Sequence, residues 1–184
     1  GIMKKIVFVC LGNICRSPMA EFVMKDLTDQ YEIESRATSS WEHGNPIHRG
    51  TQKIFQQYQV PYDPAKTSLQ IKEEDFYTFD VILGMDANNV ADLKQMAPVG
   101  TEHKIHLFAA ESVPDPWYTG DFEETYRRVL AGCEVWLDQL ATSEEFDMWE
   151  NTGYERILWD LQGLSDTKNL EIVALIVMIL SVLM

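Results

Sequence analysis

The sequence predicts an α/β fold, a doubly wound open sheet of about four parallel strands with helices on both faces. Three observations predict it. Short apolar runs, typical of strands buried on both faces, alternate with amphipathic helical segments. A helical segment separates successive runs, which is the pattern of parallel strands joined by crossovers. The 184 residues suffice for one domain with a substantial core.

Strands are predicted over residues 4–10, 31–37, 79–83 and 104–108. The first is a continuous apolar run after a charged lead, and the third is also predicted to be buried. With the intervening helices this is a flavodoxin-like arrangement, in which ligands bind at the carboxyl ends of the strands. Cys10 ends the first strand, so it lies at that edge.

The helices are predicted from apolar periodicity and from proline start signals. Ser17 is interpreted as an N-cap, with Pro18 at the first helical position. Further helices are predicted to begin at Pro46 and to cover 86–93 and 121–140, whereas 113–118, with two prolines, is predicted to be a loop.

Charge and cysteine usage exclude several classes of function. The net charge of −14 disfavours nucleic acid and anionic membranes as partners, so a phosphate site must be a local positive feature. Three cysteines, an odd number, argue against a disulfide framework and favour a cytoplasmic location. The four histidines show no metal-ligand spacing, and we expect no metal or other cofactor.

The segment after the first strand carries the chemistry. Cys10 and Arg16, separated by five residues, can curl into one cradle whose backbone N–H groups bind phosphate. Arg16 can grip two phosphate oxygens, and the following helix directs its positive end to the same point. That field stabilises a thiolate on Cys10, to which Ser17 could donate a hydrogen bond. The predicted phosphate-binding residues are Leu11, Gly12, Asn13, Ile14, Cys15 and Arg16.

Two loop residues suit such a cradle. Gly12 permits close approach or positive φ, and Asn13 tolerates left-handed backbone geometry. The alternative is that Cys10 is a small buried apolar residue at a strand end. The buried strand before the loop and the Ser-Pro pair after it favour the functional interpretation.

Residues 9–21, Val-Cys-Leu-Gly-Asn-Ile-Cys-Arg-Ser-Pro-Met-Ala-Glu, closely resemble the signature of the low-molecular-weight protein tyrosine phosphatase family. The resemblance implies a phosphatase domain over 3–142 with catalytic Cys10, Arg16 and Asp115. It implies a phosphocysteine on Cys10. Asp115 would give a proton to the leaving group and take one from the attacking water. Alone, an Asp-Pro pair is more often a surface turn.

The resemblance also assigns supporting residues. Asn13 and Ser35 match positions that hold the shape of the loop, and Asp86 matches one that orients Arg16. Asp86 fits a helix N-cap equally well. With Ser17, these complete the supporting set.

Three aromatic residues are predicted to wall the substrate cleft: Trp41, Trp117 and Tyr118. A slot between aromatic faces selects a flat phenyl ring and keeps short phosphoserine from the sulfur. The predicted partner is therefore a phosphotyrosine-containing protein. Taken singly, each of these aromatics would more often belong to a core.

Other functions compete with this one. A phosphocysteine-type phosphocarrier requires neither Arg16 nor Asp115. A phosphoarginine phosphatase branch of the family carries Thr where this chain has Ile14. Thioredoxin-coupled arsenate reductases need further downstream cysteines, and here only Cys133 remains. A non-catalytic phosphotyrosine reader would normally lack the nucleophile or the acid.

Two further features bear on regulation and on departures from the family. Cys15 could form a disulfide with Cys10 under peroxide and protect the nucleophile, or it could be a buried loop residue without such a role. Near residues 66–70 many relatives carry a histidine and an arginine, for which Lys66 or Thr67 and Leu69 stand here.

Residues 143–184 extend past the family pattern and end in an apolar run over 172–184. The run is shorter than the roughly 20 residues that a membrane helix needs, so a membrane anchor is disfavoured. We expect a packed helix or strand that covers an apolar patch or mediates self-association. An artefactual extension is the other interpretation. At the other end, Met3 is the expected natural start.

Overall fold

The computed structural model describes residues 2–151 and 170–183. The chain divides into two units, 1–136 and 137–184, which are described separately. The first holds a four-stranded parallel sheet in the order β2-β1-β3-β4. Its strands are β1 (Lys5–Cys10), β2 (Glu32–Ala37), β3 (Val81–Gly84) and β4 (Ile105–Leu107). The predicted α/β class is confirmed.

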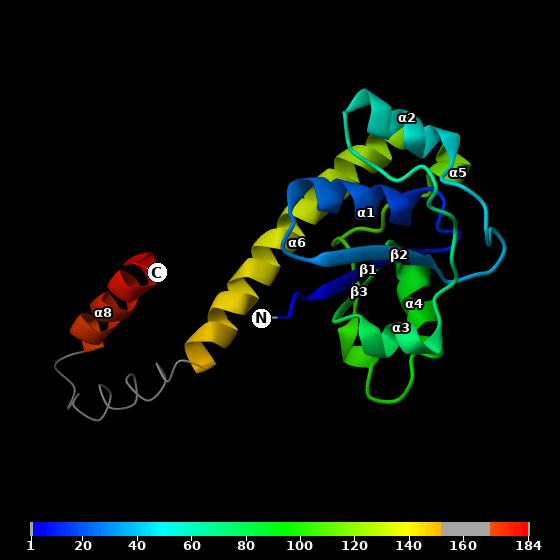
Figure 1. Cartoon of the computed structure of the whole chain (residues 1–184). Coiled ribbons are helices and arrows are strands. Elements are labelled where there is room, and N and C mark those ends of the chain that lie inside the picture. The colour runs from blue at the N-terminus through cyan, green and yellow to red at the C-terminus, as the bar shows by residue number, and fades with distance from the viewer. Residues whose placement is uncertain (1, 152–169, 184) are drawn as a thin grey trace. The chain divides into compact units, whose positions relative to one another are not determined.

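Helices cover both faces of this sheet (Figure 1). On one face lie α1 (Arg16–Leu27) and the first part of α6 (Phe122–Asn151), where the Cys133 thiol lies 3.8 Å from the Ala20 carbonyl oxygen. On the other face lie α3 (Glu73–Thr78) and α4 (Ala87–Met96). Among the described residues this unit also holds the α-helices α2 (Arg49–Gln57) and α5 (Pro116–Thr119), and a 3-10 helix, η1 (Glu102–Lys104), precedes β4.

The side chains of β1 alternate between two cores. Val7 and Val9 belong to one apolar cluster, and the Phe8 ring meets the Phe108 ring edge to face at 5.7 Å on the other side. Each buried side chain of this size contributes roughly 1.5–3 kcal/mol. The Val7 cluster also contains Ile71, Phe76, Phe79, Ile82, Leu93 and Ile105.

The central place of β1 positions the site. Hydrogen bonds join β1 to β2 on one side and to β3 on the other, with Cys10 opposite Ala37. Because all strands are parallel, their carboxyl ends share one edge. The chain leaves β1 in one direction and β3 in the other, so Cys10 lies at a switch point of the sheet, where such folds bind ligands.

The start of α1 differs from the prediction. The helix begins at Arg16 with Cys15 as its N-cap, and no side chain caps it. Ser17 is therefore not the N-cap, because its hydroxyl is engaged with Cys10 and Asn13 instead. The first N–H groups of the helix stay available to a ligand.

The start of α2 also differs. It begins at Arg49, and the ring Nδ1 of His48 accepts the Gly50 N–H at 2.9 Å. Pro46 precedes the helix and forms an isolated bridge with Thr67. The His48 imidazole thus caps α2, and histidine is not among the residue types that predict an N-cap.

The segment predicted as a loop at 113–118 contains the start of α5. Pro116 takes the first helical position, where its missing N–H is not needed, and Asp115 is the N-cap. Gly120 then ends the helix in the left-handed region at φ 69°. Pro116 starts a short helix here, so the loop prediction was wrong for residues 116–118.

Two helices differ from the prediction, one by its presence and one by its length. The short α3 was not predicted. Helix α6 runs to Asn151, past the predicted end at residue 140, because 141–147 holds no glycine or proline stop signal.

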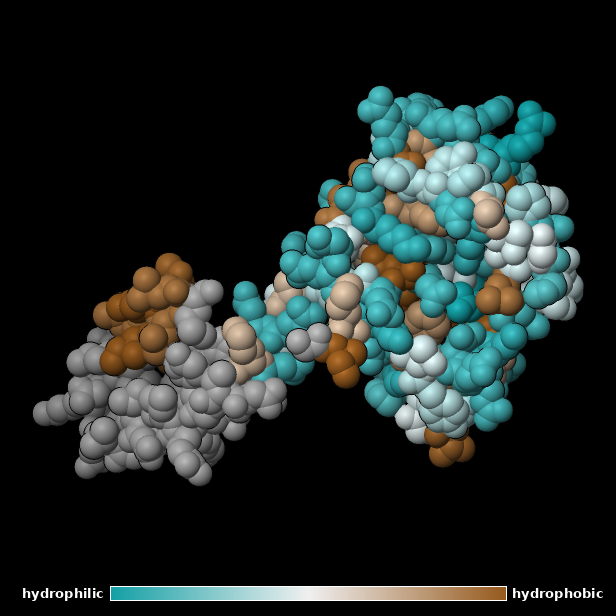
Figure 2. Space-filling model, viewed as in Figure 1, coloured by the Kyte–Doolittle hydropathy of each residue, from teal (hydrophilic) through white to brown (hydrophobic). Residues whose placement is uncertain are grey.

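In the second unit, α8 (Leu170–Leu183) follows the remainder of α6. Figure 2 shows the visible surface of α8 as apolar. No helix among the described residues is both long and apolar enough to cross a membrane. Residues 152–169 of the predicted extension lie outside the described residues.

Candidate active site

The loop between β1 and α1 turns its carbonyl oxygens outward. Because a trans peptide unit is planar, the N–H that follows each such carbonyl points the opposite way, into the loop. The inward groups belong to Leu11, Gly12, Asn13, Cys15 and Arg16. The outward acceptors and their donors are Cys10 O with Thr38 N–H (2.9 Å), Leu11 O with Ser39 Oγ (2.8 Å), Gly12 O with Ser68 Oγ (2.8 Å), Ile14 O with His48 N–H (2.9 Å) and Cys15 O with Thr51 Oγ1 (3.1 Å).

The Cys10 thiol lies inside this ring. Its Sγ accepts from the Asn13 N–H at 3.2 Å and lies 3.0 Å from Ser17 Oγ. The uncapped N-terminus of α1 adds its positive end at the same point. Hydrogen bonds and a helix dipole of this sign stabilise a thiolate.

Asn13 connects the loop to distant parts of the chain. Its φ of 54° is left-handed, as predicted. Its Nδ2 donates to Ser17 Oγ (2.8 Å) and to Ser35 Oγ (2.9 Å), and its Oδ1 accepts from the Leu69 N–H (3.1 Å). The shape of the loop is thus tied to α1, to β2 and to the segment before α3.

Arg16 is buried, with two of its nitrogens in use. Nη1 donates to Asp86 Oδ2 (2.6 Å) and to the Val113 carbonyl (3.0 Å), and Nη2 donates to Asp115 Oδ2 (3.2 Å). Nε is buried and has no partner among the described residues. Burial acts to lower the pKa of Arg16, but the charges of Cys10, Asp115 and Asp86 outweigh it and raise the pKa. The guanidinium therefore stays cationic, with its Nε–H unpaired among the described residues.

Both carboxylates that hold Arg16 are also helix caps. The Oδ1 of Asp86 accepts the Asn89 N–H (2.7 Å) at the start of α4. The Oδ1 of Asp115 accepts the Trp117 N–H (3.0 Å) at the start of α5. The two interpretations of Asp86, cap and arginine partner, hold at the same time.

A pocket of about 130 Å³ opens above the loop. It joins the Cys10–Arg16 loop to Asp115 and to the three predicted aromatics, of which Trp41 and Tyr118 are largely exposed. Ser17, Ser35 and Asp86 lie outside its lining, behind the loop.

Glu42 also lines the pocket, and sequence reasoning missed it. Its Oε2 accepts from Asn45 Nδ2 at 2.6 Å. A Cβ on Gly12 would lie 3.3 Å from the Glu42 Cγ, so the glycine permits this close approach. The position of Glu42 next to Trp41 in the sequence was the signal that could have placed it in the pocket.

Cys15 lines the pocket as a buried thiol. Burial, and next the charge of Cys10, raise its pKa, so it stays protonated. All three cysteines are free. The described residues contain no group of three or more side chains suited to a metal ion.

A thiol in a ring of inward N–H groups, beside a buried guanidinium and a carboxyl at the pocket wall, is the arrangement of a cysteine-dependent phosphatase. Comparison with known proteins agrees. A family model described as low molecular weight phosphotyrosine protein phosphatase matches residues 5–146. The low molecular weight protein-tyrosine-phosphatase PtpA of Staphylococcus epidermidis is 40% identical over 148 residues, covering 75% of this chain and 94% of PtpA.

Two further relatives are similar over nearly their whole length. The low molecular weight protein-tyrosine-phosphatase YfkJ of Bacillus subtilis is 37% identical over 158 residues, which is 78% of this chain and 99% of YfkJ. The crystal structure of SP-PTP, a low molecular weight protein tyrosine phosphatase from Streptococcus pyogenes, has 58% identity and a TM-score of 0.75, covering 79% of this chain and 98% of that chain. The chain belongs to the low molecular weight phosphotyrosine protein phosphatase family, a family of phosphoric monoester hydrolases.

Proposed function

We propose that the chain hydrolyses phosphotyrosine in protein substrates through a phosphocysteine on Cys10. One observation carries this proposal: Cys10, Arg16 and Asp115 all line one pocket. The inward N–H groups and Arg16 would hold the phosphate against Sγ and neutralise its charge in the transition state.

The reaction takes two steps. Cys10 Sγ attacks phosphorus while the bond from phosphorus to the phenol oxygen breaks, and Asp115 gives that oxygen a proton. Water then attacks the phosphocysteine and gives a proton to Asp115, and Sγ leaves as a thiolate with release of inorganic phosphate. Ser17 would stabilise the departing thiolate.

Substrate would also rearrange the contacts of Arg16. Without ligand, Arg16 Nη2 donates to Asp115. Phosphate oxygens compete for that N–H, so binding would release the Asp115 carboxyl toward the leaving group. The 2.6 Å bond to Asp86 would keep the guanidinium in place, and Asn13 and Ser35 would keep the shape of the loop.

The aromatic wall supports phosphotyrosine as the substrate. Trp41, Trp117 and Tyr118 flank the pocket over the loop, as a flat ring requires. Phosphoarginine is the second candidate, because the Glu42 carboxylate in the wall could face a guanidinium. Asp115 beside Arg16 argues against a phosphocarrier, which needs no acid.

The test is phosphate release from phosphotyrosine, phosphoserine and phosphoarginine peptides. We expect turnover of phosphotyrosine, none in Cys10→Ser, and in Asp115→Asn a loss that is largest for poor leaving groups. No release from any peptide by the wild-type chain would refute hydrolysis and favour a carrier or reader.

We further propose that residues 3–142 form the phosphatase domain and that 143–184 are an extension that mediates self-association. The apolar α8 supports the second part. The free cysteines support a cytoplasmic location, and the net charge of −14 disfavours nucleic acid and anionic membranes as partners.

A further inference from the structure

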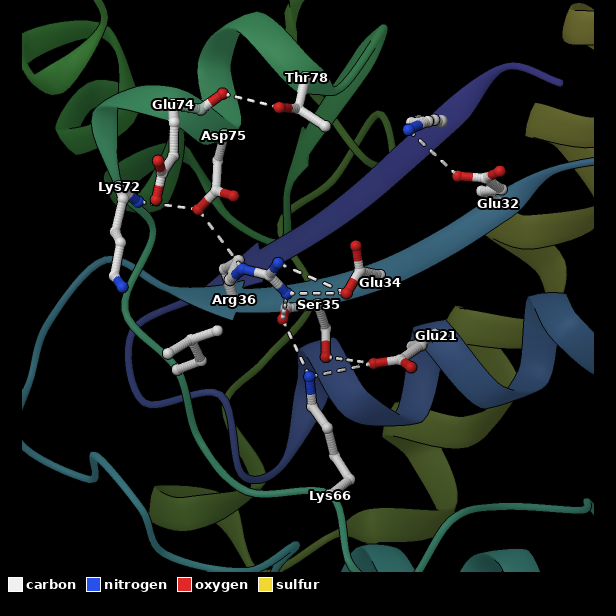
Figure 3. A network of polar contacts seen from close by, with 12 residues as sticks. Glu21, Glu32, Glu34, Ser35, Arg36, Lys66, Lys72, Glu74, Asp75 and Thr78 are labelled. Atoms are coloured by element: carbon white, nitrogen blue, oxygen red, sulfur yellow. Dashed lines mark hydrogen bonds and ion pairs between the residues drawn. The ribbon is translucent and has the colours of Figure 1, made fainter. Parts of the chain in front are cut away.

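A buried carboxylate lies behind the phosphate loop, outside the pocket. Glu21 of α1 is only 3% exposed. Its Oε1 accepts from Ser35 Oγ (2.6 Å) and lies 3.4 Å from Lys66 Nζ, and its Oε2 accepts from Lys25 Nζ (2.6 Å). Figure 3 shows Glu21, Ser35 and Lys66 converging beside β2. A carboxylate is costly to bury, even when paired, and nothing in the reaction so far uses it.

From Ser35, hydrogen bonds continue without a break to the nucleophile. Asn13 Nδ2 donates to Ser35 Oγ (2.9 Å) and to Ser17 Oγ (2.8 Å), and Ser17 Oγ lies 3.0 Å from Cys10 Sγ. Asn13, Ser17 and Ser35 are at most 1% exposed. Water therefore does not compete for these bonds, and each group must find its partner inside the protein.

Glu21 and the Leu69 N–H together fix the direction of the bonds in this series. An ionised carboxylate only accepts, so the Ser35 hydroxyl proton points to Glu21 and its oxygen is left to accept from Asn13. The Leu69 N–H holds Asn13 Oδ1, so the amide nitrogen must face the two serines. Ser17 Oγ then accepts from Asn13 and has its own proton to give.

The Ser17 proton has two acceptors within reach. One is Cys10 Sγ at 3.0 Å, and the other is the Arg36 carbonyl oxygen at 3.3 Å. A thiolate attracts the proton more strongly than a carbonyl does, because a charged acceptor makes the stronger bond.

We propose that Glu21 is a positioning residue for the reaction, acting through Ser35 and Asn13 to keep the Ser17 O–H directed at the Cys10 thiolate. This inference rests on the proposed function, in which Cys10 is the nucleophile. Without the Glu21 carboxylate, Ser35 would lose its acceptor and would no longer help to hold the Asn13 amide, so the Ser17 O–H would lose the support that directs it.

Lys66 completes the arrangement. Its Nζ lies beside Glu21 and donates to the Ser35 carbonyl at 3.0 Å. Lys66 belongs to the segment 66–70, in which many relatives carry a histidine and an arginine that this sequence lacks. The positive charge of Lys66 thus faces the carboxylate oxygen that accepts from Ser35.

The experiment is a double-mutant cycle between Glu21→Gln and Ser17→Ala. The readouts are the thiolate absorbance of Cys10, taken as the difference from Cys10→Ser, and kcat/KM for a phosphotyrosine peptide, both at neutral pH. We expect Glu21→Gln alone to lower kcat/KM by about fivefold, the equivalent of one hydrogen bond, and to lower the thiolate absorbance. With Ser17→Ala already present, Glu21→Gln should have no additional effect.

Ser35→Ala breaks the same series without changing a buried charge, so it serves if Glu21→Gln does not fold. It should lower both readouts similarly. Lys25→Met is the matched control, because Lys25 pairs with the other oxygen of Glu21; it should leave the thiolate absorbance unchanged.

A stability loss in Glu21→Gln, with wild-type absorbance and kcat/KM, would overturn the proposal and leave Glu21 a structural residue. Equal effects of Glu21→Gln with and without Ser17 would overturn it too. An inactive wild-type chain is a separate outcome, which refutes the proposed function itself.

Discussion

Arg16 and Asp86 are joined by a 2.6 Å ion pair in which the carboxylate serves a second helix at the same time. One oxygen of Asp86 accepts from Arg16, and the other caps α4 through the Asn89 N–H. The guanidinium is 3% exposed and the carboxylate 21%. Because Asp86 is fixed as the N-cap of α4, the position of Arg16 is coupled to that helix.

Substitution of Asp86 should separate these two tasks. Asparagine caps helices about as well as aspartate, so Asp86→Asn should reduce kcat/KM on the order of tenfold while changing the unfolding free energy little. Asp86→Ala loses the cap too and should cost about 1 kcal/mol more in stability. Steady-state kinetics and denaturant unfolding of both variants check this. Equal stability of the two would contradict the cap.

The buried thiol of Cys133 should make stability depend on alkaline pH. Burial raises its pKa above the ordinary 9.0. Above that pH the unfolded chain releases a proton that the folded chain retains, so the unfolding free energy falls as pH rises; below it this thiol contributes no slope. The expected decline is about 1.4 kcal/mol per pH unit for one thiol.

Cys133→Ala tests this dependence. The variant should lose that part of the slope, while any cost of the cavity is the same at every pH. Denaturant unfolding of both chains over a series of alkaline pH values gives the difference. Parallel curves would show that Cys133 does not titrate as argued.

Peroxide should inactivate the chain reversibly. It would oxidise Cys10 to a sulfenic acid, from which the Cys15 sulfur displaces water to form a disulfide. Because burial raises the pKa of Cys15, disulfide formation should speed up with rising pH. Activity should return with dithiothreitol in the wild type. It should stay lost in Cys15→Ser, because there a second peroxide oxidises the Cys10 sulfenic acid to the irreversible sulfinic acid. Recovery in both would exclude this role for Cys15.

The charge of Glu42 should influence which peptides are preferred. It lines the pocket, so it should favour a basic residue beside the phosphotyrosine. Glu42→Gln is expected to shift the ratio of kcat/KM for basic and acidic peptides by about threefold toward the acidic ones. Glu73→Gln, which removes the same charge from exposed Glu73 outside the pocket, is the control. The same shift in both would indicate net charge alone.

Most of the fold was predictable because its signals are local. The central strands β1 and β3 are apolar runs, and the Cys10–Arg16 spacing lies within a single loop. The predicted strand ends moved by at most two residues at each side. Trp41, Trp117 and Tyr118 were predictable as pocket residues because polar or loop-forming neighbours favoured their exposure.

The errors have a common physical origin. Ser17 looked like a helix cap, but its hydroxyl is used by the nucleophile. Glu21 was missed because its importance depends on what it contacts, and for Glu42 the one signal was its place next to Trp41. Glu21 meets Ser35 and Lys66, and Glu42 meets the glycine of the loop. Such pairings arise only from the folded topology.

The outward carbonyls of the phosphate loop have a consequence for how the chain acquires its chemistry. Their donors come from residues 38–39, 48–51 and 68, on segments that meet only when the sheet and its connections are complete. Contacts of such sequence separation form late in folding. In a nascent or partly folded chain the phosphate loop therefore lacks these donors. Catalytic activity then requires that folding be complete.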